Sequence, residues 1–162
     1  MISQTAEYAL RAMVVIAQHT TQPILTPEIA KQTKVPPGYL AKILQALGRA
    51  NLVRSQRGIG GGFLLARPAD EISVLDVVNS VDPVKRIHTC PLEIAAHGVA
   101  LCPLHRELDD AASLIEKAFT RCTLQRLLSE DARALCGERG RAAVPVAIEG
   151  KKQQPRPASN KQ

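Results

Sequence analysis

The chain has 162 residues, of which 45% are hydrophobic, and it carries a formal net charge of +6. This length suits one well-packed domain with an appendage, and no apolar run reaches the roughly eighteen residues that a membrane span needs, which excludes an integral membrane protein. Two tyrosines, two phenylalanines and no tryptophan argue against a stacking platform for single-stranded nucleic acid.

The start of the chain does not resemble a targeting segment. Glu7 and Arg11 interrupt its apolar pattern, and no basic leader precedes a small-residue cleavage site. We therefore expect a cytoplasmic protein. Cysteines stay reduced in that compartment, so clustered cysteines there more often bind metal or carry redox chemistry than form structural disulfides.

The positive charge is concentrated at the end of the chain. Residues 137–162 hold six basic and two acidic side chains, a charge of +4, which leaves +2 for residues 1–136. This segment contains three prolines and little apolar periodicity, so we predict a disordered tail from about Arg139 onward. A solvated tail is favoured over a dedicated binding arm.

Three helices are expected near the N-terminus. Residues 5–19 carry apolar side chains at helical spacing, which indicates an amphipathic helix with one buried face. A short second helix is predicted with Thr26 as N-cap and Pro27 at its first helical position. The third begins near Pro37, and its apolar face consists of Leu40, Ile43, Leu44 and Leu47.

The next stretch changes from helical to strand character. The runs NLVRSQ and GFLLAR are β-prone, and RGIGGG between them supplies the glycines of a tight reversal. Phosphate-binding loops are also glycine-rich, but they join a strand to a helix and carry a Lys-Ser/Thr or a later acidic partner, which this stretch lacks. Three helices followed by a hairpin predict a winged helix-turn-helix DNA-binding domain over residues 1–82.

In such a domain the third helix enters the major groove of double-stranded DNA, while the hairpin and the flanking basic residues contact phosphates. Taken one by one, these polar side chains could equally be the solvated faces of a helix and a hairpin. Together they occupy the two elements that would meet DNA, which favours binding. The candidate contacts are Tyr39, Lys42, Gln45, Arg49, Arg54, Gln56 and Arg57.

A long helix is expected near the C-terminal end of the folded part. Ser73 is the predicted N-cap of a short valine-rich helix, a loop over residues 83–102 follows, and a helix runs from Pro103 to about Ser129 within a dimerisation segment 103–136. Its apolar stripe needs a partner, because the core is already supplied. A second copy packed in antiparallel fashion would give a homodimer suited to a palindromic operator. The stripe includes Leu104, Leu108, Ile115, Leu124 and Leu128. The expected fold is mainly α with a small β-hairpin wing.

The loop and the helix start contain the stretch CPLEIAAHGVALCPLH, residues 90–105, with two cysteines and two histidines. Zinc would accept Cys90, Cys102, His97 and His105 as a tetrahedral set, although the eleven-residue gap between the cysteines is not a standard structural-zinc spacing. A disulfide switch would need only the two cysteines. No nucleophile-base-acid set, catalytic carboxylate pair or nucleotide motif is present, so we do not expect an enzyme.

The residues resemble the IscR/NsrR-type winged-helix transcription regulators of bacteria, within the Rrf-two superfamily. The matching stretches are SQTAEYALRAM, VPPGYLAKILQALGRANLVRSQRGIGGGFLLAR, ISVLDVVNSVD and CPLH, which span about residues 3 to 128. The resemblance implies a homodimeric DNA-binding regulator, often a repressor. In the third helix, Gly38, Ala41 and Lys42 stand where the cluster-assembly branch has more polar residues, so the operator is not carried over.

Many members of that family hold an iron-sulfur cluster in the loop before the dimer helix. The resemblance places the first and last cluster cysteines at Cys90 and Cys102, with a histidine at His105; the middle cysteine is absent, and its place falls at Ala96 beside His97. Some members add an acidic side chain of the first helix, here Glu7. Imidazole can replace thiolate on one iron of a two-iron cluster, so a mixed Cys/His/Glu two-iron site is favoured over a cubane.

The expected function is a transcription regulator, most simply a repressor, that senses redox state, nitric oxide or iron-sulfur status through this loop. The alternatives are a cluster-free protein acting as a thiol-disulfide switch, a zinc-binding protein, or a constitutive DNA-binding protein. Each metal candidate also has a plain structural alternative. For His105 it is a solvent-facing side chain, and for Glu7 an ion pair with Arg11, its i+4 neighbour.

Overall fold

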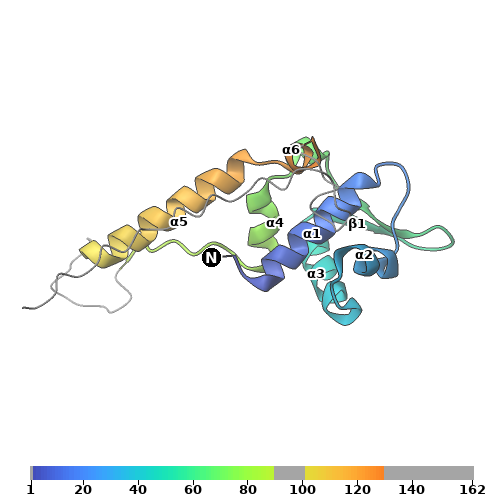
Figure 1. The fold of residues 1–162 in the computed structure, drawn as a ribbon, viewed down its shortest axis with the longest axis horizontal. Helices are drawn as coiled ribbons and strands as arrows, with labels where there is room; N and C mark the ends of the chain where they lie inside the picture. The colour runs from blue at the N-terminus through green and yellow to red at the C-terminus, as the bar shows by residue number, and fades with distance from the viewer. Residues whose placement is uncertain (1, 90–100, 130–162) are drawn as a thin grey trace, which may run out of the picture.

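The computed structural model describes residues 2–89 and 101–129, which fold into a mainly helical structure with one two-stranded antiparallel hairpin (Figure 1). This arrangement confirms the predicted winged helix-turn-helix fold class. The elements in chain order are α1 (Gln4–Gln18), α2 (Thr26–Thr33), α3 (Pro37–Arg49), β1 (Val53–Gln56), β2 (Gly62–Leu65), the short 3-10 helix η1 (Ala69–Glu71), α4 (Val74–Val81), α5 (Pro103–Arg121) and α6 (Leu124–Ser129).

The core is built around α1, which contacts α2, α3, α4, α6 and the hairpin. Residues 12–17 are all buried, so the helix is covered on nearly every side in its second half. The prediction of a single buried face was therefore wrong for this half, because α6 and the hairpin cover sides that the apolar period does not reveal. The buried face of α3 consists of the four predicted residues, Leu40, Ile43, Leu44 and Leu47.

The helix starts differ in how they are capped. Ser3 caps α1, and its hydroxyl accepts a hydrogen bond from the N–H of Ala6 at 3.2 Å. Ser73 caps α4 as predicted, and forms a capping box in which Asp76 reaches back to the N–H of Ser73 at 2.9 Å. Thr26, predicted as the N-cap of α2, is instead its first helical residue, and the N-cap at Leu25 makes no side-chain bond.

The hairpin is attached to the helices through the segment that precedes α2. Val53 pairs with Leu65 and Gln56 with Gly62, and Ile24 adds a bridge to Phe63 with N···O distances of 3.0 and 2.9 Å. Gly62 has φ +147°, and a Cβ built there would lie 2.5 Å from the carbonyl oxygen of Ile24. Only glycine allows the backbones to approach this closely, so Gly62 fixes the root of the wing.

The predicted long helix is interrupted. α5 ends at Arg121, and the next residues are extended because the backbone there bonds to another segment: the N–H of Val74 donates to the carbonyl of Cys122 at 2.8 Å, and the N–H of Leu124 to the carbonyl of Ile72 at 2.9 Å. Leu124 is then fully buried in the core of its own domain. The prediction of one continuous helix to Ser129 with Leu124 on a dimer stripe was wrong for this reason.

The first half of α5 extends away from the body of the protein, and the segment that leaves α4 runs beside it (Figure 1). No residue of α5 is buried within the described chain, and four of its large apolar side chains are exposed: Leu104, Leu108, Leu114 and Ile115. The predicted tail over residues 137–162, the end of the dimerisation segment, and Cys90 and His97 lie outside the described residues.

Candidate nucleic-acid interface and cysteine site

The predicted DNA contacts are borne by α3 and by the hairpin, which lie at the same end of the molecule (Figure 1). Because α3 buries one row of leucines and isoleucine, its opposite row of polar side chains faces solvent. All seven predicted residues are exposed: Tyr39, Lys42, Gln45, Arg49, Arg54, Gln56 and Arg57.

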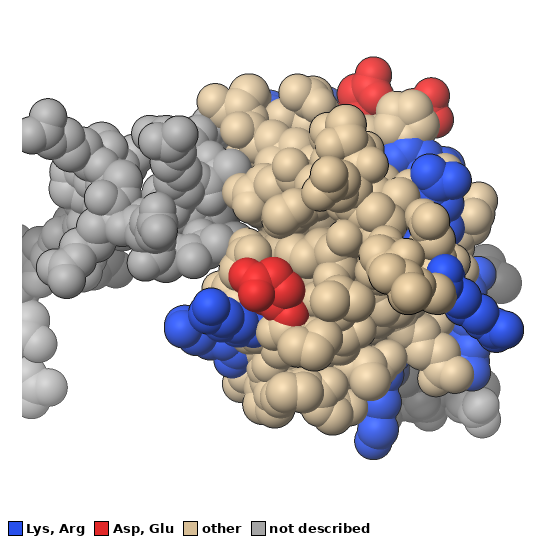
Figure 2. Space-filling view, turned by 90° about the vertical axis from the view of Figure 1, so that its right-hand side faces the viewer, with Lys and Arg blue, Asp and Glu red and all other residues tan. Residues whose placement is uncertain are grey.

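The face that contains these elements is predominantly basic at its edges. Figure 2 shows lysine and arginine side chains at several places around the rim, with acidic side chains confined to two smaller areas and an uncharged centre. Basic side chains at the edges of a largely uncharged surface suit contacts with DNA phosphates.

The end of α2 and the turn before α3 add two lysines that the sequence analysis missed. Lys31 lies in the last turn of α2, and Lys34 at its C-cap has the left-handed backbone angles φ 59° and ψ 26°; both side chains are exposed. The sequence alone could have indicated them, because two basic residues stand shortly before the predicted start of the third helix at Pro37. Because they shortly precede α3 in the chain, they are further candidates for contacts with DNA phosphates.

Tyr39 is held by α1 as well as by α3. Its hydroxyl is hydrogen-bonded to Thr5, and its ring meets Tyr8 edge-on with 5.8 Å between centroids. The side chain is 40% exposed, so its hydroxyl can reach a phosphate. The contacts with Thr5 and Tyr8 restrict the position from which it does so. Tyr39 thus ties the start of α3 to the start of α1.

The two arginines of the hairpin lie in different surroundings. Arg54 lines a cavity together with His19 at the end of α1 and Leu128 of α6, which sets it apart from the other candidates. Arg57 begins the glycine-rich tip, where Ile59 is fully exposed. The tip therefore presents one cation, Arg57, and one apolar side chain, Ile59, next to glycines whose backbone is conformationally permissive.

Cys102 and His105 form a pair at the start of α5. Cys102 is the N-cap, Pro103 follows it, and one turn later the Nδ1 atom of His105 lies 3.2 Å from the Cys102 Sγ atom. Both side chains are half-buried, and Cys102 is a free thiol. The structure therefore brings together two of the predicted ligands.

Glu7 does not join this pair within one protomer. Its carboxylate forms an ion pair with Arg11, and Arg11 also lies over the ring of Tyr8 and reaches the carbonyl of Thr33 at 3.4 Å. The i+4 ion pair that the sequence indicated is thus present. Within residues 2–89 and 101–129 no three His, Cys, Asp or Glu side chains gather closely enough to hold a metal ion.

Cys122 has a structural position. It is half-buried beside the small apolar cluster of Ala6, Val74 and Val78, and its carbonyl accepts the N–H of Val74. Phe119 packs against the same cluster. The Cys122 side chain therefore packs within its own protomer.

Comparison with known proteins assigns this chain to a family. The family profile Rrf2, described as an iron-dependent transcriptional regulator, matches residues 2–130. The chain belongs to the Rrf2 family of transcriptional regulators. It is therefore a DNA-binding regulator and not an enzyme. No helix in the described part of this Rrf2-family chain has the length and apolar character to cross a membrane.

One curated relative and two solved structures illustrate what this Rrf2-family chain is similar to. The chain is 30% identical to the HTH-type transcriptional regulator IscR of Sodalis glossinidius over 131 residues, which cover 80% of this chain and 79% of that protein. The structure of T. potens IscR matches with a TM-score of 0.69 at 24% identity, covering 86% of this chain and 93% of that one. CymR, the global cysteine regulator of B. subtilis, matches with a TM-score of 0.67 at 23% identity over 80% and 97% of the two chains.

Proposed function

We propose that this Rrf2-family regulator binds a palindromic DNA operator as a homodimer and represses transcription in response to the state of an iron-sulfur cluster. The observation that carries the sensing part is the Cys102–His105 pair, with 3.2 Å between Sγ and Nδ1. A thiolate donor and an imidazole donor one turn apart at a helix start, both half-buried, suit a metal centre better than a solvated surface.

DNA recognition follows from the exposed row of α3. Lys42 and Gln45 lie in the middle of that row, where a helix in the major groove reaches base edges, and Arg49 lies in its last turn near the level of the backbone. Arg57 at the hairpin and Lys34 in the turn add phosphate contacts on either side. These contacts supply affinity, and the central pair supplies sequence selection.

Dimerisation is carried by α5. Its exposed apolar side chains, Leu104, Leu108, Leu114 and Ile115, are 38 to 67% accessible in the single chain. They cover the first three turns and more of a helix that extends beyond its own domain. A second copy packed against this helix removes them from water and places two recognition helices on one side of a two-fold axis.

The residues of the chain suit a mixed-ligand cluster. Cys102 and His105 fit as a thiolate and an imidazole ligand, and Cys90, His97 and Glu7 are the further candidates. When bound, such a cluster supplies a centre that changes its oxidation state by one electron or is lost altogether. Glu7 would have to leave Arg11 to bind metal; because that ion pair is solvent-exposed, its loss costs only about 0 to 1 kcal/mol.

The chain itself provides the coupling to DNA. Arg11 connects Glu7 to the end of α2 through the carbonyl of Thr33, and Tyr8 connects the same turn of α1 to Tyr39 of α3. If Glu7 served as a ligand, Arg11 would lose its carboxylate partner, and its guanidinium would then lie unpaired with Glu7 next to the end of α2. The two states then differ in contacts at the DNA-binding elements, which a population shift requires.

The experiment that tests this function starts with protein purified without oxygen. Its absorption spectrum is recorded, and iron and acid-labile sulfide are quantified per protomer in the same sample. Visible charge-transfer bands with about two iron and two sulfide per protomer support the cluster. A colourless, iron-free protein after anaerobic reconstitution contradicts it, and zinc analysis and thiol counting then separate a zinc site from a Cys90–Cys102 disulfide switch.

A further inference from the structure

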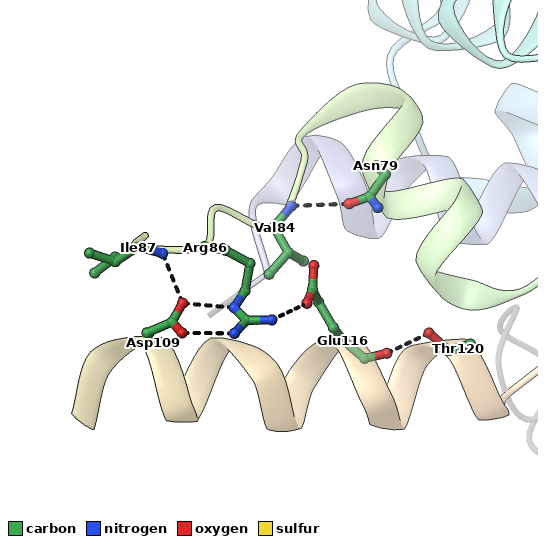
Figure 3. A network of polar contacts seen from close by, with 7 residues as sticks. All are labelled: Asn79, Val84, Arg86, Ile87, Asp109, Glu116 and Thr120. Carbon is green, nitrogen blue, oxygen red and sulfur yellow. Dashed lines mark hydrogen bonds and ion pairs between the residues drawn. The ribbon is translucent and has the colours of Figure 1, made fainter. Parts of the chain in front are cut away.

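One arginine on the segment that leaves α4 is held by two carboxylates of α5. The Nε and Nη2 atoms of Arg86 donate to the two oxygens of Asp109, each at 2.7 Å, and Nη1 donates to Glu116 at 2.9 Å. The backbone N–H of Ile87 donates to the same Asp109 carboxylate at 2.8 Å (Figure 3). We call this group of four residues the Arg86 clamp.

The Arg86 clamp differs from the other ion pairs within residues 2–89 and 101–129. Its side chains are 14 to 28% exposed, whereas Glu7 and Arg11 are 55 and 39% exposed and Arg67 lies 3.8 Å from Asp76. Arg86 holds the pKa of Asp109 well below its ordinary value, and the two carboxylates raise the pKa of Arg86. A bidentate fork of this kind is geometrically specific, because both N–H groups must lie in the carboxylate plane.

The clamp fixes the direction of α5. Asp109 and Glu116 are two helical turns apart and face the same neighbouring segment (Figure 3). The other end of α5 is fixed by the backbone bonds of Cys122 and Leu124 to residues 72–74. These two attachments lie about 20 Å apart along the helix, so together they determine its direction. Without the Arg86 clamp, α5 keeps the contacts near its C-terminal end, where Phe119 packs against Val74 and Val78 of α4, and its N-terminal half loses its attachment through Asp109.

The start of the segment is secured as well. The N–H of Val84 donates to the side chain of Asn79 in α4 at 3.0 Å, so the chain between α4 and Arg86 has little freedom (Figure 3). The direction of α5 is thereby fixed relative to α4, and α4 packs on α1 and α3. Contacts run without interruption from α5 to the recognition helix.

We infer that Arg86 is a positioning residue that sets the angle between α5 and the DNA-binding domain, and thereby the separation of half-sites that the dimer selects. This inference rests on the proposed dimerisation through α5. In a two-fold dimer joined by α5, the angle of this helix determines how far apart the two α3 helices lie. Half-site separation on DNA follows the same geometry, with centres one helical turn apart or a multiple of it.

A purely stabilising ion pair would act differently. Its loss would lower the free energy of unfolding but leave the preferred half-site separation unchanged in the molecules that remain folded. Separation preference is therefore the readout that identifies a positioning role. Arginine should also be needed in particular, because lysine offers no planar fork for Asp109 and cannot reach Glu116 at the same time.

The experiment compares full-length variants on a series of duplexes. Half-sites are first obtained by selecting a random-sequence duplex library with the wild-type protein, and are then placed at the selected separation and at separations shorter or longer by about 1 and 2 base pairs. Dissociation constants are measured by fluorescence anisotropy for wild type, Arg86→Gln, Arg86→Lys and Asp109→Asn. Lys85→Gln is the matched control, since it removes the same charge from the adjacent exposed position.

We expect the wild type and Lys85→Gln to prefer the selected separation by about tenfold over those two base pairs away, and Arg86→Gln to lose most of that preference, with Arg86→Lys intermediate. If Arg86→Gln fails to fold, Asp109→Asn gives the same comparison. A folded variant that discriminates as sharply as wild type overturns the inference, and so does a wild type without separation preference. A wild type that selects no duplex overturns the proposed function itself.

Discussion

The Sγ atom of Cys102 lies 3.2 Å from the Nδ1 atom of His105, one turn along the same helix. The remaining described thiol, Cys122, faces an apolar cluster inside its own protomer. The two cysteines therefore offer a direct internal comparison, because only one of them stands beside a second metal-binding side chain.

Replacement of Cys102 should remove the metal while the fold persists. We expect Cys102→Ala, purified without oxygen, to lose at least about nine-tenths of its iron, since a thiolate ligand is absent. Cys122→Ala is the control and should keep its iron, with a modest loss of stability from the cavity. Equal iron content in the two variants would contradict the assignment of Cys102 as a ligand.

His105 should tune the potential of the centre. Imidazole in place of thiolate raises the reduction potential of a two-iron cluster. We therefore expect His105→Cys to retain iron and to lower the midpoint potential by on the order of 100 mV or more, measured by redox titration of the visible bands. An unchanged midpoint potential in an iron-loaded variant would show that His105 is not a ligand.

Lys42 should contribute to operator affinity. We expect Lys42→Ala to weaken binding about tenfold, because the side chain lies in the middle of the exposed row of α3. If Lys42 contacts phosphate, the slope of log affinity against log salt falls by about 1; if it contacts a base, the loss concentrates on one operator position. Lys117→Ala on α5 is the control, and unchanged affinity in Lys42→Ala would remove this residue from the interface.

Gly62 should be required for the wing. A methyl group at this position would meet the carbonyl of Ile24 at 2.5 Å, and φ +147° is unfavourable for any other residue. We expect Gly62→Ala to lower the free energy of unfolding by about 2 kcal/mol, measured by urea denaturation. Gly38→Ala, where nothing lies within 4 Å of the added carbon, should be neutral within about 1 kcal/mol. Equal effects would refute the close approach.

The Arg86 clamp has an acid-side signature. The pKa of Asp109 is lower in the folded protein than in the unfolded chain, where it is about 4, so its contribution to stability is present above that pH and is lost as the pH falls below it. We expect Asp109→Asn to be less stable than wild type at pH 7, with the difference shrinking below about pH 4. Asp110→Asn, one residue along, is the control. A difference that is independent of pH would argue against the ionised pair.

Local signals predicted most of the fold. The apolar period of residues 37–49 predicted α3 and its buried face, the glycines of RGIGGG predicted the hairpin, and Ser73 was recognised as a cap. Each of these features depends on residues close together in sequence, which is why the pattern alone sufficed.

Features that depend on distant segments were missed. The break between α5 and α6 arises from backbone bonds to residues 72–74, and the bridge of Ile24 to Phe63 joins segments nearly forty residues apart. Arg86 and its partners are separated by 23 and 30 residues. At the candidate site, the sequence suggested Cys102 and His105 as neighbours, but the ties of Tyr39 to Thr5 and of Arg11 to Thr33 required the packed helices.

The most direct test of the account is the operator affinity of one anaerobic preparation, measured by fluorescence anisotropy on a selected duplex before and after the cluster is removed with oxidant and chelator. The account predicts a change of about tenfold or more in the dissociation constant, with Cys102→Ala locked at the cluster-free value. The same dissociation constant before and after removal would contradict it, because the Cys102–His105 site would then have no influence on DNA binding.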